Sequence, residues 1–136
     1  MVFDDSAPFE GTILVVEDDP GVRDVAVQML NMAGFTVIEA EDAGSGLAKF
    51  KRYPEIDLVF TDVILPGGVS GIEMTKDILK HKPHTLILLA TGYEAKAAAL
   101  QDLAARVDTI RAIKKPYDVN KIPGLINSMI ATANNR

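Results

Sequence analysis

Several short apolar runs of this chain end in, or lead into, side chains that can do chemistry. Asp62 ends the run Ile-Asp-Leu-Val-Phe-Thr-Asp, and Glu17 and Asp18 follow Ile-Leu-Val-Val. Thr91 and Lys115 stand at the ends of two later runs. Ligands of open parallel sheets bind outside the carboxyl ends of the strands, so these positions make the side chains functional candidates. Taken singly, each has a plainer interpretation, because a strand-end Asp or Thr often only bonds its own turn.

Brought together, these side chains indicate phosphoryl transfer. Three carboxylates in one cleft repel one another unless a cation compensates, and either a divalent metal or Lys115 could do so. All-oxygen ligands favour Mg²⁺, which keeps several waters and therefore a position for a phosphoryl oxygen. A metal, Lys115 and the Thr91 hydroxyl are suited to neutralise charge on a transferring phosphoryl group while Asp62 attacks it.

The elements that must position these residues follow from hydrophobic periodicity. Asp19 and Ser70 are suited to cap helices, Pro20 to open one and Gly34 to close it. Strict alternation of strands and helices, with continuous apolar strands, predicts a parallel sheet covered by helices on both faces. Strands are expected at 12–16, 35–40, 56–61, 85–90 and 109–113, and helices at 20–33, 43–53, 70–81, 94–105 and 122–133.

Composition narrows the class of protein. A chain of 136 residues is one domain by length, with residues 1–10 expected as a flexible lead-in and 11–136 as the domain. The net charge of −5 and the lack of a basic run argue against direct DNA binding. Without cysteine there is no disulfide and no thiolate chemistry. No apolar stretch is long enough for a membrane span and no signal peptide is evident, so a cytoplasmic location is expected.

On these residues the chain resembles a response-regulator receiver domain of bacterial two-component signalling. The matching motifs are Val-Val-Glu-Asp-Asp-Pro, Asp62 with Pro66 four residues later, Ala-Thr-Gly-Tyr around Thr91, and Lys-Lys-Pro-Tyr around Lys115. The resemblance covers 11–133. It implies a flavodoxin-like, doubly wound, five-stranded parallel sheet of order 2-1-3-4-5 with five helices. In that order the first and third strands are neighbours, so the acidic pair would converge on Asp62.

The resemblance also implies a role for each matching residue. Asp62 would accept a phosphoryl group. Asp18 and Asp62 would bind Mg²⁺ directly, together with the backbone carbonyl of Ile64, while Glu17 would act partly through water. Lys115 would pair with the phosphoryl group. Thr91 would move to hydrogen-bond it, remodelling the surface of the fourth helix, fifth strand and fifth helix.

The partners expected from the resemblance are a phosphodonor and a target. The donor would be a sensor histidine kinase or a histidine phosphotransfer protein, and the downstream protein target is unknown. The chain would catalyse only its own phosphorylation and dephosphorylation, as a monomer or a phosphorylation-dependent dimer. Only residues 134–136 follow the last helix, so output is expected through protein contacts. The chain is interpreted as a single-domain regulator, or alternatively as the receiver of a hybrid histidine kinase.

Three other readings are disfavoured by particular residues. A metal-dependent phosphatase with an aspartyl nucleophile usually carries a second Asp two residues later, where this chain has Ile64. A flavodoxin-like nucleotide binder would need a loop after the first strand that accepts phosphate, and this loop is acidic. A pseudo-receiver acting only as a scaffold is disfavoured because every phosphorylation residue is present.

The chain departs from the common receiver pattern in several places. Glu17 replaces the commoner Asp and lengthens the reach to a metal by one methylene. Gly71 lies nine residues after Asp62 rather than eight, which enlarges a Pro-Gly-Gly loop. Ala112 stands where many receivers carry an aromatic switch residue, which argues against a Thr–aromatic route of signal propagation.

Two positions on the rim of the expected pocket, Ile64 and Tyr93, tune hydrolysis of the acyl phosphate in this family. Both side chains are bulky, and neither has a carboxylate or amide that could orient an attacking water. The sequence therefore predicts a phosphoryl state that lasts minutes or more.

Overall fold

The computed structural model describes residues 8–92, 105 and 107–134. The helix expected at 94–105 lies almost wholly outside the described residues, as do Tyr93 and most of the lead-in at 1–10. The described elements are β1 (Thr12–Val16), α1 (Pro20–Ala33), β2 (Thr36–Ala40), α2 (Ala43–Arg52), β3 (Leu58–Asp62), α3 (Gly71–His81), β4 (Leu86–Thr91), β5 (Ile110–Lys114), the short 3₁₀ helix η2 (Val119–Lys121) and α5 (Ile122–Asn134).

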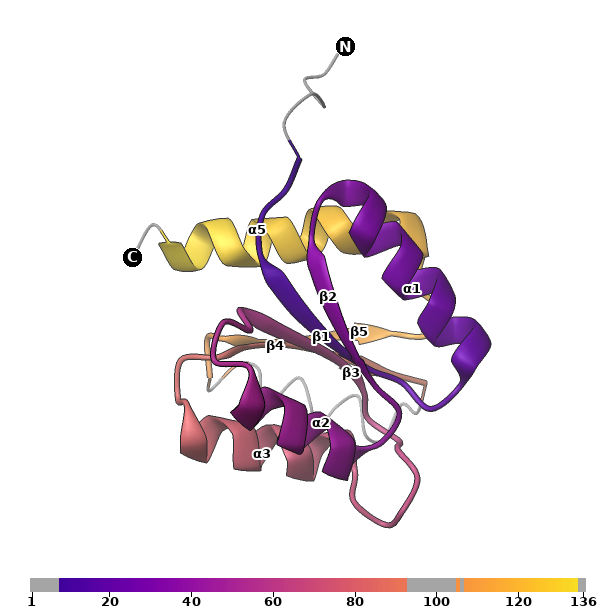
Figure 1. Cartoon of the computed structure of the whole chain (residues 1–136), viewed down its shortest axis with the longest axis vertical. Coiled ribbons are helices and arrows are strands. Elements are labelled where there is room, and N and C mark those ends of the chain that lie inside the picture. Colours follow the sequence, from indigo (N-terminus) through magenta and orange to yellow (C-terminus); the bar gives the residue numbers. More distant parts are fainter. Residues whose placement is uncertain (1–7, 93–104, 106, 135–136) are drawn as a thin grey trace.

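The strands form one five-stranded parallel sheet of order β2-β1-β3-β4-β5, as expected. β3 lies at its centre and pairs with β1 on one edge and β4 on the other. Figure 1 shows α1 and α5 on one face of the sheet and α2 and α3 on the other. None of the described helices combines the length and the hydropathy needed to cross a bilayer.

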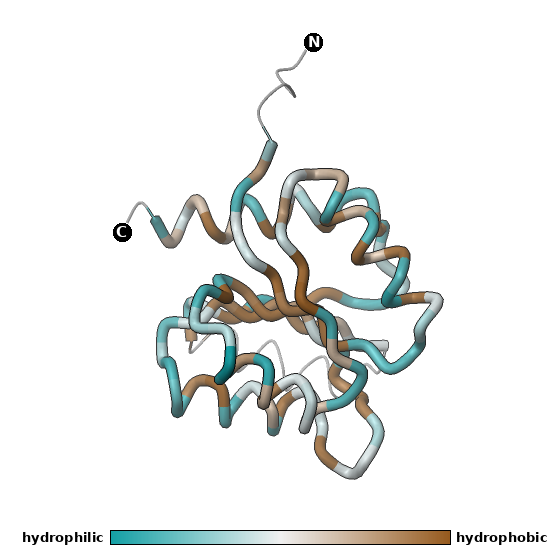
Figure 2. Tube along the Cα trace, viewed as in Figure 1, coloured by the Kyte–Doolittle hydropathy of each residue, from teal (hydrophilic) through white to brown (hydrophobic). Residues whose placement is uncertain are grey.

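Two layers of core fill the spaces between sheet and helices. Alternate residues of a strand point to opposite faces. Thus Leu14 and Val16 of β1 pack in the cluster beneath α2 and α3, while Ile13 and Val15 pack beneath α1 and α5. Because both faces are covered, the three central strands β1, β3 and β4 are buried and apolar along most of their length, as the brown central segments of Figure 2 show.

Capping residues mark where α1 and α3 begin, near the carboxyl ends of the strands. Asp19 accepts hydrogen bonds from the amides of Gly21, at 2.9 Å, and Val22, at 3.2 Å. Ser70 accepts from the Glu73 amide at 3.1 Å and opens α3. These caps orient both helices at the edge of the sheet where the candidate residues lie.

Several element ends differ by a residue or two from those predicted. β3, β4 and β5 each begin later and end one residue later than expected, so Asp62 and Thr91 lie inside the sheet. The cause is backbone pairing: Asp62 is in register with Ala90, and Thr91 with Lys114. β2 begins at 36 rather than 35, and α2 ends at 52 rather than 53. The polar strand-end residues are therefore held by the sheet and not by loops.

Candidate functional site

Asp62 is the last residue of β3, and both of its carboxylate oxygens have partners. The Lys115 ammonium lies 2.5 Å from Oδ2, and the Ile64 amide donates to Oδ1 at 3.2 Å. The Asp62 side chain is 11% exposed and that of Lys115 is 33% exposed. A carboxylate held at this depth stays reachable from solvent on one side.

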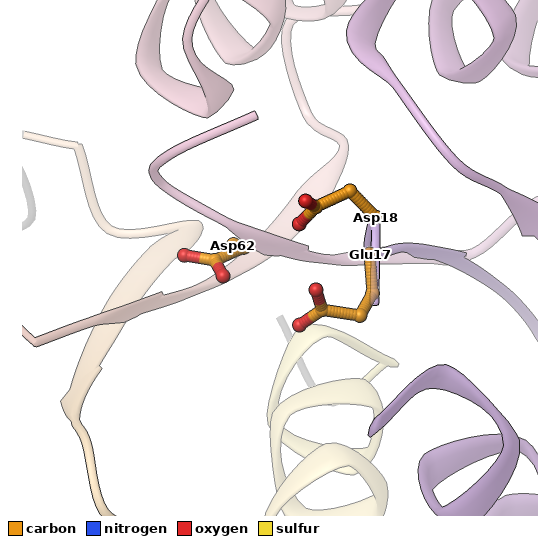
Figure 3. A group of neighbouring side chains, drawn as sticks. All are labelled: Glu17, Asp18 and Asp62. Carbon is orange, nitrogen blue, oxygen red and sulfur yellow. The ribbon is translucent and has the colours of Figure 1, made fainter. Parts of the chain in front are cut away.

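Glu17 and Asp18 follow β1 and lie beside Asp62. Figure 3 shows their side chains projecting toward the strand that carries Asp62. One carboxylate oxygen from each of the three residues lies within 4.8 Å of the other two. Glu17 is buried and Asp18 is exposed, so the group opens to solvent on the Asp18 side. Three converging carboxylates form an all-oxygen donor set, which fits Mg²⁺.

The backbone of the acidic pair is fixed at several points. The Glu17 amide donates to the Ala40 carbonyl at 3.0 Å, which continues the pairing between β1 and β2. The Glu17 Oε2 atom accepts from the Asp19 amide at 3.0 Å. Arg23 of α1 donates to the Glu17 carbonyl at 2.7 Å and to Glu39 Oε1 at 3.2 Å. The sequence reasoning did not identify Arg23, since an arginine in the first turns of a helix gives no signal that it faces a strand end.

The electrostatics of the site favour a bound cation. Burial raises the pKa of Glu17, and the nearby acids Asp18 and Asp62 raise it further, against the Asp19 amide and Lys115, which lower it. Burial lowers the pKa of Lys115, but the hydrogen bond and charge of Asp62 outweigh burial, so the pKa lies above its ordinary value. Lys115 therefore stays charged, while burial and the neighbouring acids disfavour the ionised form of Glu17.

An open pocket of about 340 Å³ connects these groups to solvent. Asp18, Asp62, Ile64 and Lys115 all line it, so the structure brings together most of the predicted site. Gly92 also lines it, together with two residues of the loop after Asp62, Leu65 and Pro66.

Thr91 and Glu17 are placed differently from the pocket-lining residues. Thr91 is 2% exposed at the end of β4, and its carbonyl accepts from the Lys115 amide at 2.8 Å. Thr91 is not among the residues that line the pocket around Asp62. Glu17 instead lines a separate small pocket, together with Asp62 and Tyr117. Burial raises the pKa of Tyr117, so its hydroxyl stays protonated.

The enlarged loop after Asp62 returns tightly to the end of β3. The Gly71 amide donates to the Val63 carbonyl at 2.7 Å. A Cβ atom at position 71 would lie 2.1 Å from the Asp62 carbonyl oxygen, which is too close for any side chain. At the loop tip, Gly67 and Gly68 have φ angles of +86° and +79°, which favour glycine. The loop thus packs directly on the backbone of the candidate acceptor.

A second depression adjoins the pocket on the α1 side. It has a volume of about 590 Å³ and is mainly apolar, and Lys115 lines both depressions. Val22 and Val25 of α1 face it and are 42% and 49% exposed. We call this second depression the α1 groove; its lining residues are Gly21, Val22, Val25, Lys115, Pro116, Tyr117 and Val119.

Comparison with known proteins agrees with this geometry. The model of the response regulator receiver domain matches residues 13–127. The chain is 34% identical over 108 residues to a cyclic di-GMP phosphodiesterase of Thermotoga maritima, covering 79% of this chain and 28% of that protein. It is 27% identical over 121 residues to the response regulator receiver protein CpdR of Brucella abortus, covering 89% of this chain and 98% of that protein.

The fold of a solved receiver agrees as well. A response regulator receiver domain protein of Clostridium thermocellum superposes with a TM-score of 0.81 at 25% identity, covering 92% of this chain and 98% of that one. The sheet order, the acidic group beside Asp62 and the match over residues 13–127 point the same way. The chain belongs to the response regulator receiver domain family of two-component systems.

Proposed function

We propose that the chain accepts a phosphoryl group on Asp62 from a phosphohistidine. The observation that carries this proposal is the environment of one carboxylate. Asp62 faces a solvent pocket, has Lys115 at 2.5 Å, and lies beside two further acids that need a cation. Such an environment suits a nucleophile whose product is an anionic acyl phosphate.

The proposed transfer moves the phosphoryl group from a nitrogen of the donor histidine to an oxygen of Asp62. An Asp62 oxygen attacks phosphorus, the O–P bond forms as the N–P bond of the donor breaks, and the imidazole nitrogen takes the electron pair. The donor ring, protonated on its other nitrogen, leaves as neutral imidazole. Lys115 exchanges its contact with Asp62 Oδ2 for the phosphoryl oxygens, so its charge compensates the charge that arrives. Asp62 then carries the acyl phosphate.

Glu17, Asp18 and Asp62 would hold Mg²⁺ together with the backbone carbonyl of Ile64. When bound, the ion supplies charge neutralisation at the phosphoryl oxygens. The acidic group supports this assignment because its oxygens converge and a cation would offset the burial and like charges that raise the pKa of Glu17. Asp18, which is exposed, would complete the site from the solvent side.

The phosphodonor would dock on the α1 groove. Receiver domains interact with histidine kinases or phosphotransfer proteins. In this chain the groove is apolar, carries the exposed Val22 and Val25, and meets the acceptor pocket at Lys115. A helix that presents its histidine beside apolar residues would fill the groove and bring the imidazole to Asp62.

The output of the phosphorylated domain would be a change in protein contacts, acting in the cytoplasm. Thr91 would turn toward the phosphoryl group and draw the end of β4 with it, whether the chain acts as a monomer or as a phosphorylation-dependent dimer. We propose a single-domain regulator, in line with CpdR, of which the chain spans 98%. The alternative is a receiver within a longer protein such as a hybrid histidine kinase. The cyclic di-GMP phosphodiesterase of Thermotoga maritima is a longer relative of this kind, because the match covers only 28% of its length.

The test is incubation with acetyl phosphate and Mg²⁺, followed by intact mass. We expect gain of one phosphoryl group by the native chain and none by Asp62→Asn. Asp77→Asn, an exposed acid on α3, is the matched control and should be phosphorylated as the native chain is. Phosphorylation that persists in Asp62→Asn would refute the acceptor. Repeated turnover of acetyl phosphate at enzymatic rates would instead support a phosphatase.

A further inference from the structure

Arg23 links α1 to the two strand ends on the acidic side of the site. Its guanidinium donates to the Glu17 carbonyl at 2.7 Å and, through Nε, to Glu39 Oε1 at 3.2 Å. The Arg23 side chain is 18% exposed, whereas that of Glu39 is 46% exposed. The backbone carbonyl of Glu39 accepts from the Lys49 ammonium on α2. Arg23 thus belongs to a network that joins helices of both faces at the end of β2.

The contact with the Glu17 carbonyl matters because of the peptide unit it holds. This carbonyl belongs to the peptide bond between Glu17 and Asp18, where β1 has ended and none of the described strands pairs with Asp18. The Glu17 amide is already fixed by the Ala40 carbonyl at 3.0 Å. Fixing the carbonyl as well sets the plane of the next peptide, and with it the direction in which the Asp18 side chain leaves the backbone.

We propose that Arg23 is a positioning residue for the metal site, which acts by holding the Glu17–Asp18 peptide so that both carboxylates face Asp62. The inference rests on the proposed function, because the group being positioned is the one assigned to Mg²⁺. Arg23 itself does not ligate the ion. Its planar guanidinium donates to a carbonyl and a carboxylate at once, which a lysine ammonium on a flexible stem reproduces poorly.

The sign of the effect separates positioning from simple charge. A fixed cation near a Mg²⁺ site repels the ion, so an electrostatic role predicts that removing Arg23 tightens Mg²⁺ binding. Positioning predicts the opposite, because an acidic pair that is free to turn must be ordered when the ion binds. Loss of supporting hydrogen bonds around metal ligands typically weakens metal affinity 10–100-fold. Loss of a single contact to the backbone should weaken the affinity about tenfold.

The experiment compares Mg²⁺ affinity, by calorimetric titration, for the native chain, Arg23→Met and Arg23→Lys. Arg23→Met keeps the apolar stem but removes charge and donors. We expect the Kd for Mg²⁺ to rise about tenfold in Arg23→Met and to recover only partly in Arg23→Lys. Arg52→Met, an exposed arginine at the far end of α2, is the matched control and should bind as the native chain does.

Two further readouts separate the contact from general loss of stability. The carbonyl carbon-13 shift of Glu17 in the metal-free protein should change in Arg23→Met and stay native in Arg52→Met. Phosphorylation of Arg23→Met by acetyl phosphate should approach the native rate at saturating Mg²⁺, since Asp62 and Lys115 are intact. Tighter Mg²⁺ binding by Arg23→Met, or unchanged affinity in a native chain that does bind Mg²⁺ and accept phosphate, would overturn the inference. A native chain that binds no Mg²⁺ would instead count against the proposed function.

Discussion

The Lys115 ammonium lies 2.5 Å from Asp62 Oδ2, and the carboxylates of Glu17 and Asp18 lie beside the same side chain. The proposed acceptor is therefore in contact with one cation and next to two carboxylates. When phosphate arrives, this one contact must be exchanged, because the charge that Lys115 neutralises moves from the carboxylate to the phosphoryl oxygens. The geometry makes Lys115 sensitive to the state of Asp62.

Replacing Lys115 should slow phosphorylation. In Lys115→Met we expect the rate of phosphoryl gain to fall about a hundredfold, the size typical of removing one donor that stabilises developing charge. Lys115→Arg should retain a larger share of the rate, since it keeps the charge. Initial rates from intact mass at saturating Mg²⁺ give the measurement. Lys80→Met, exposed on α3, is the control, and an equal loss there would show that charge alone, not position, is responsible.

Glu17 should make the stability of the metal-free protein depend on pH. Its pKa is raised by burial above the ordinary carboxyl value of 4.5, so the folded state holds the proton more tightly than the unfolded state. This stabilisation is present below pH 4.5 and is lost as pH rises through the folded pKa. We therefore expect the free energy of unfolding to fall less across that window in Glu17→Gln than in the native protein. We also expect Mg²⁺ to stabilise Glu17→Gln less than it stabilises the native protein.

Urea unfolding at several pH values, with and without Mg²⁺, measures this effect. Glu55→Gln, an exposed residue in the connection that leads into the amino end of β3, is the control and should follow the native pH profile. If Glu17→Gln and the native protein lose stability in parallel as pH rises, the burial of Glu17 is not the cause.

Gly71→Ala should destabilise the fold. The new Cβ would meet the Asp62 carbonyl oxygen at 2.1 Å, so the backbone must shift, at a cost of about 1–3 kcal/mol typical of overpacking. The shift would also move the acceptor. Gly124→Ala in α5 is the control, because no described residue beyond its neighbours and its own helix backbone lies within 4 Å of a Cβ placed there, and alanine favours the helix. Urea midpoints for both variants test this, and equal stability of the two would contradict the close packing.

Val25→Asp should impair transfer from a protein donor but not from acetyl phosphate. Val25 is 49% exposed and lines the α1 groove, so a charge there opposes an apolar docking surface. Met32→Asp on the same helix, 81% exposed and outside the groove, is the control. The measurement is transfer from a phosphorylated histidine phosphotransfer protein, followed for each variant. Equal loss with acetyl phosphate would place the defect at Asp62 and not in docking.

Ile64→Asn should shorten the life of the phosphoryl group. Ile64 is 43% exposed and lines the pocket, and an amide there could orient a water that the native side chain cannot. We expect decay about tenfold faster, below the 10²–10⁴-fold of a full general base. Val69→Asn is the control, because Val69 lies in the same loop and is 40% exposed but does not line this pocket. Its phosphoryl group should decay at the native rate. Rapid native decay that Ile64→Asn leaves unchanged would contradict the predicted long-lived state.

The strands, with the acidic residues and Lys115 at their carboxyl ends, could be predicted because they depend on local pattern. An apolar run that ends in Asp62, and another that leads into Glu17, mark strand ends wherever they occur. The resemblance then supplied the strand order that makes β1 and β3 neighbours, which periodicity alone does not determine. The structure confirms that order.

Arg23 and Gly71 could not be assigned in the same way, because their contacts arise only on folding. The partners of Arg23 lie on β1 and β2, and which face of α1 meets those strands depends on packing of the whole layer. For Gly71, spacing from Asp62 revealed an enlarged loop, but its approach to the Asp62 carbonyl depends on how the loop closes. The exposure of Val25 could not be predicted either, because helical periodicity does not say which apolar residues of a helix stay exposed.

The central place of β3 has a consequence for how any signal leaves the domain. Its backbone is paired with β1 along one edge as far as Thr61, and with β4 along the other as far as Asp62. New charge at Asp62 therefore cannot be accommodated by sliding the strand, because that would break two ladders at once. Adjustment falls to the end of β4, where Thr91 lies, and to the connections that follow the strands. Information would thus leave the domain as a change in loop geometry, read by whichever protein contacts those loops.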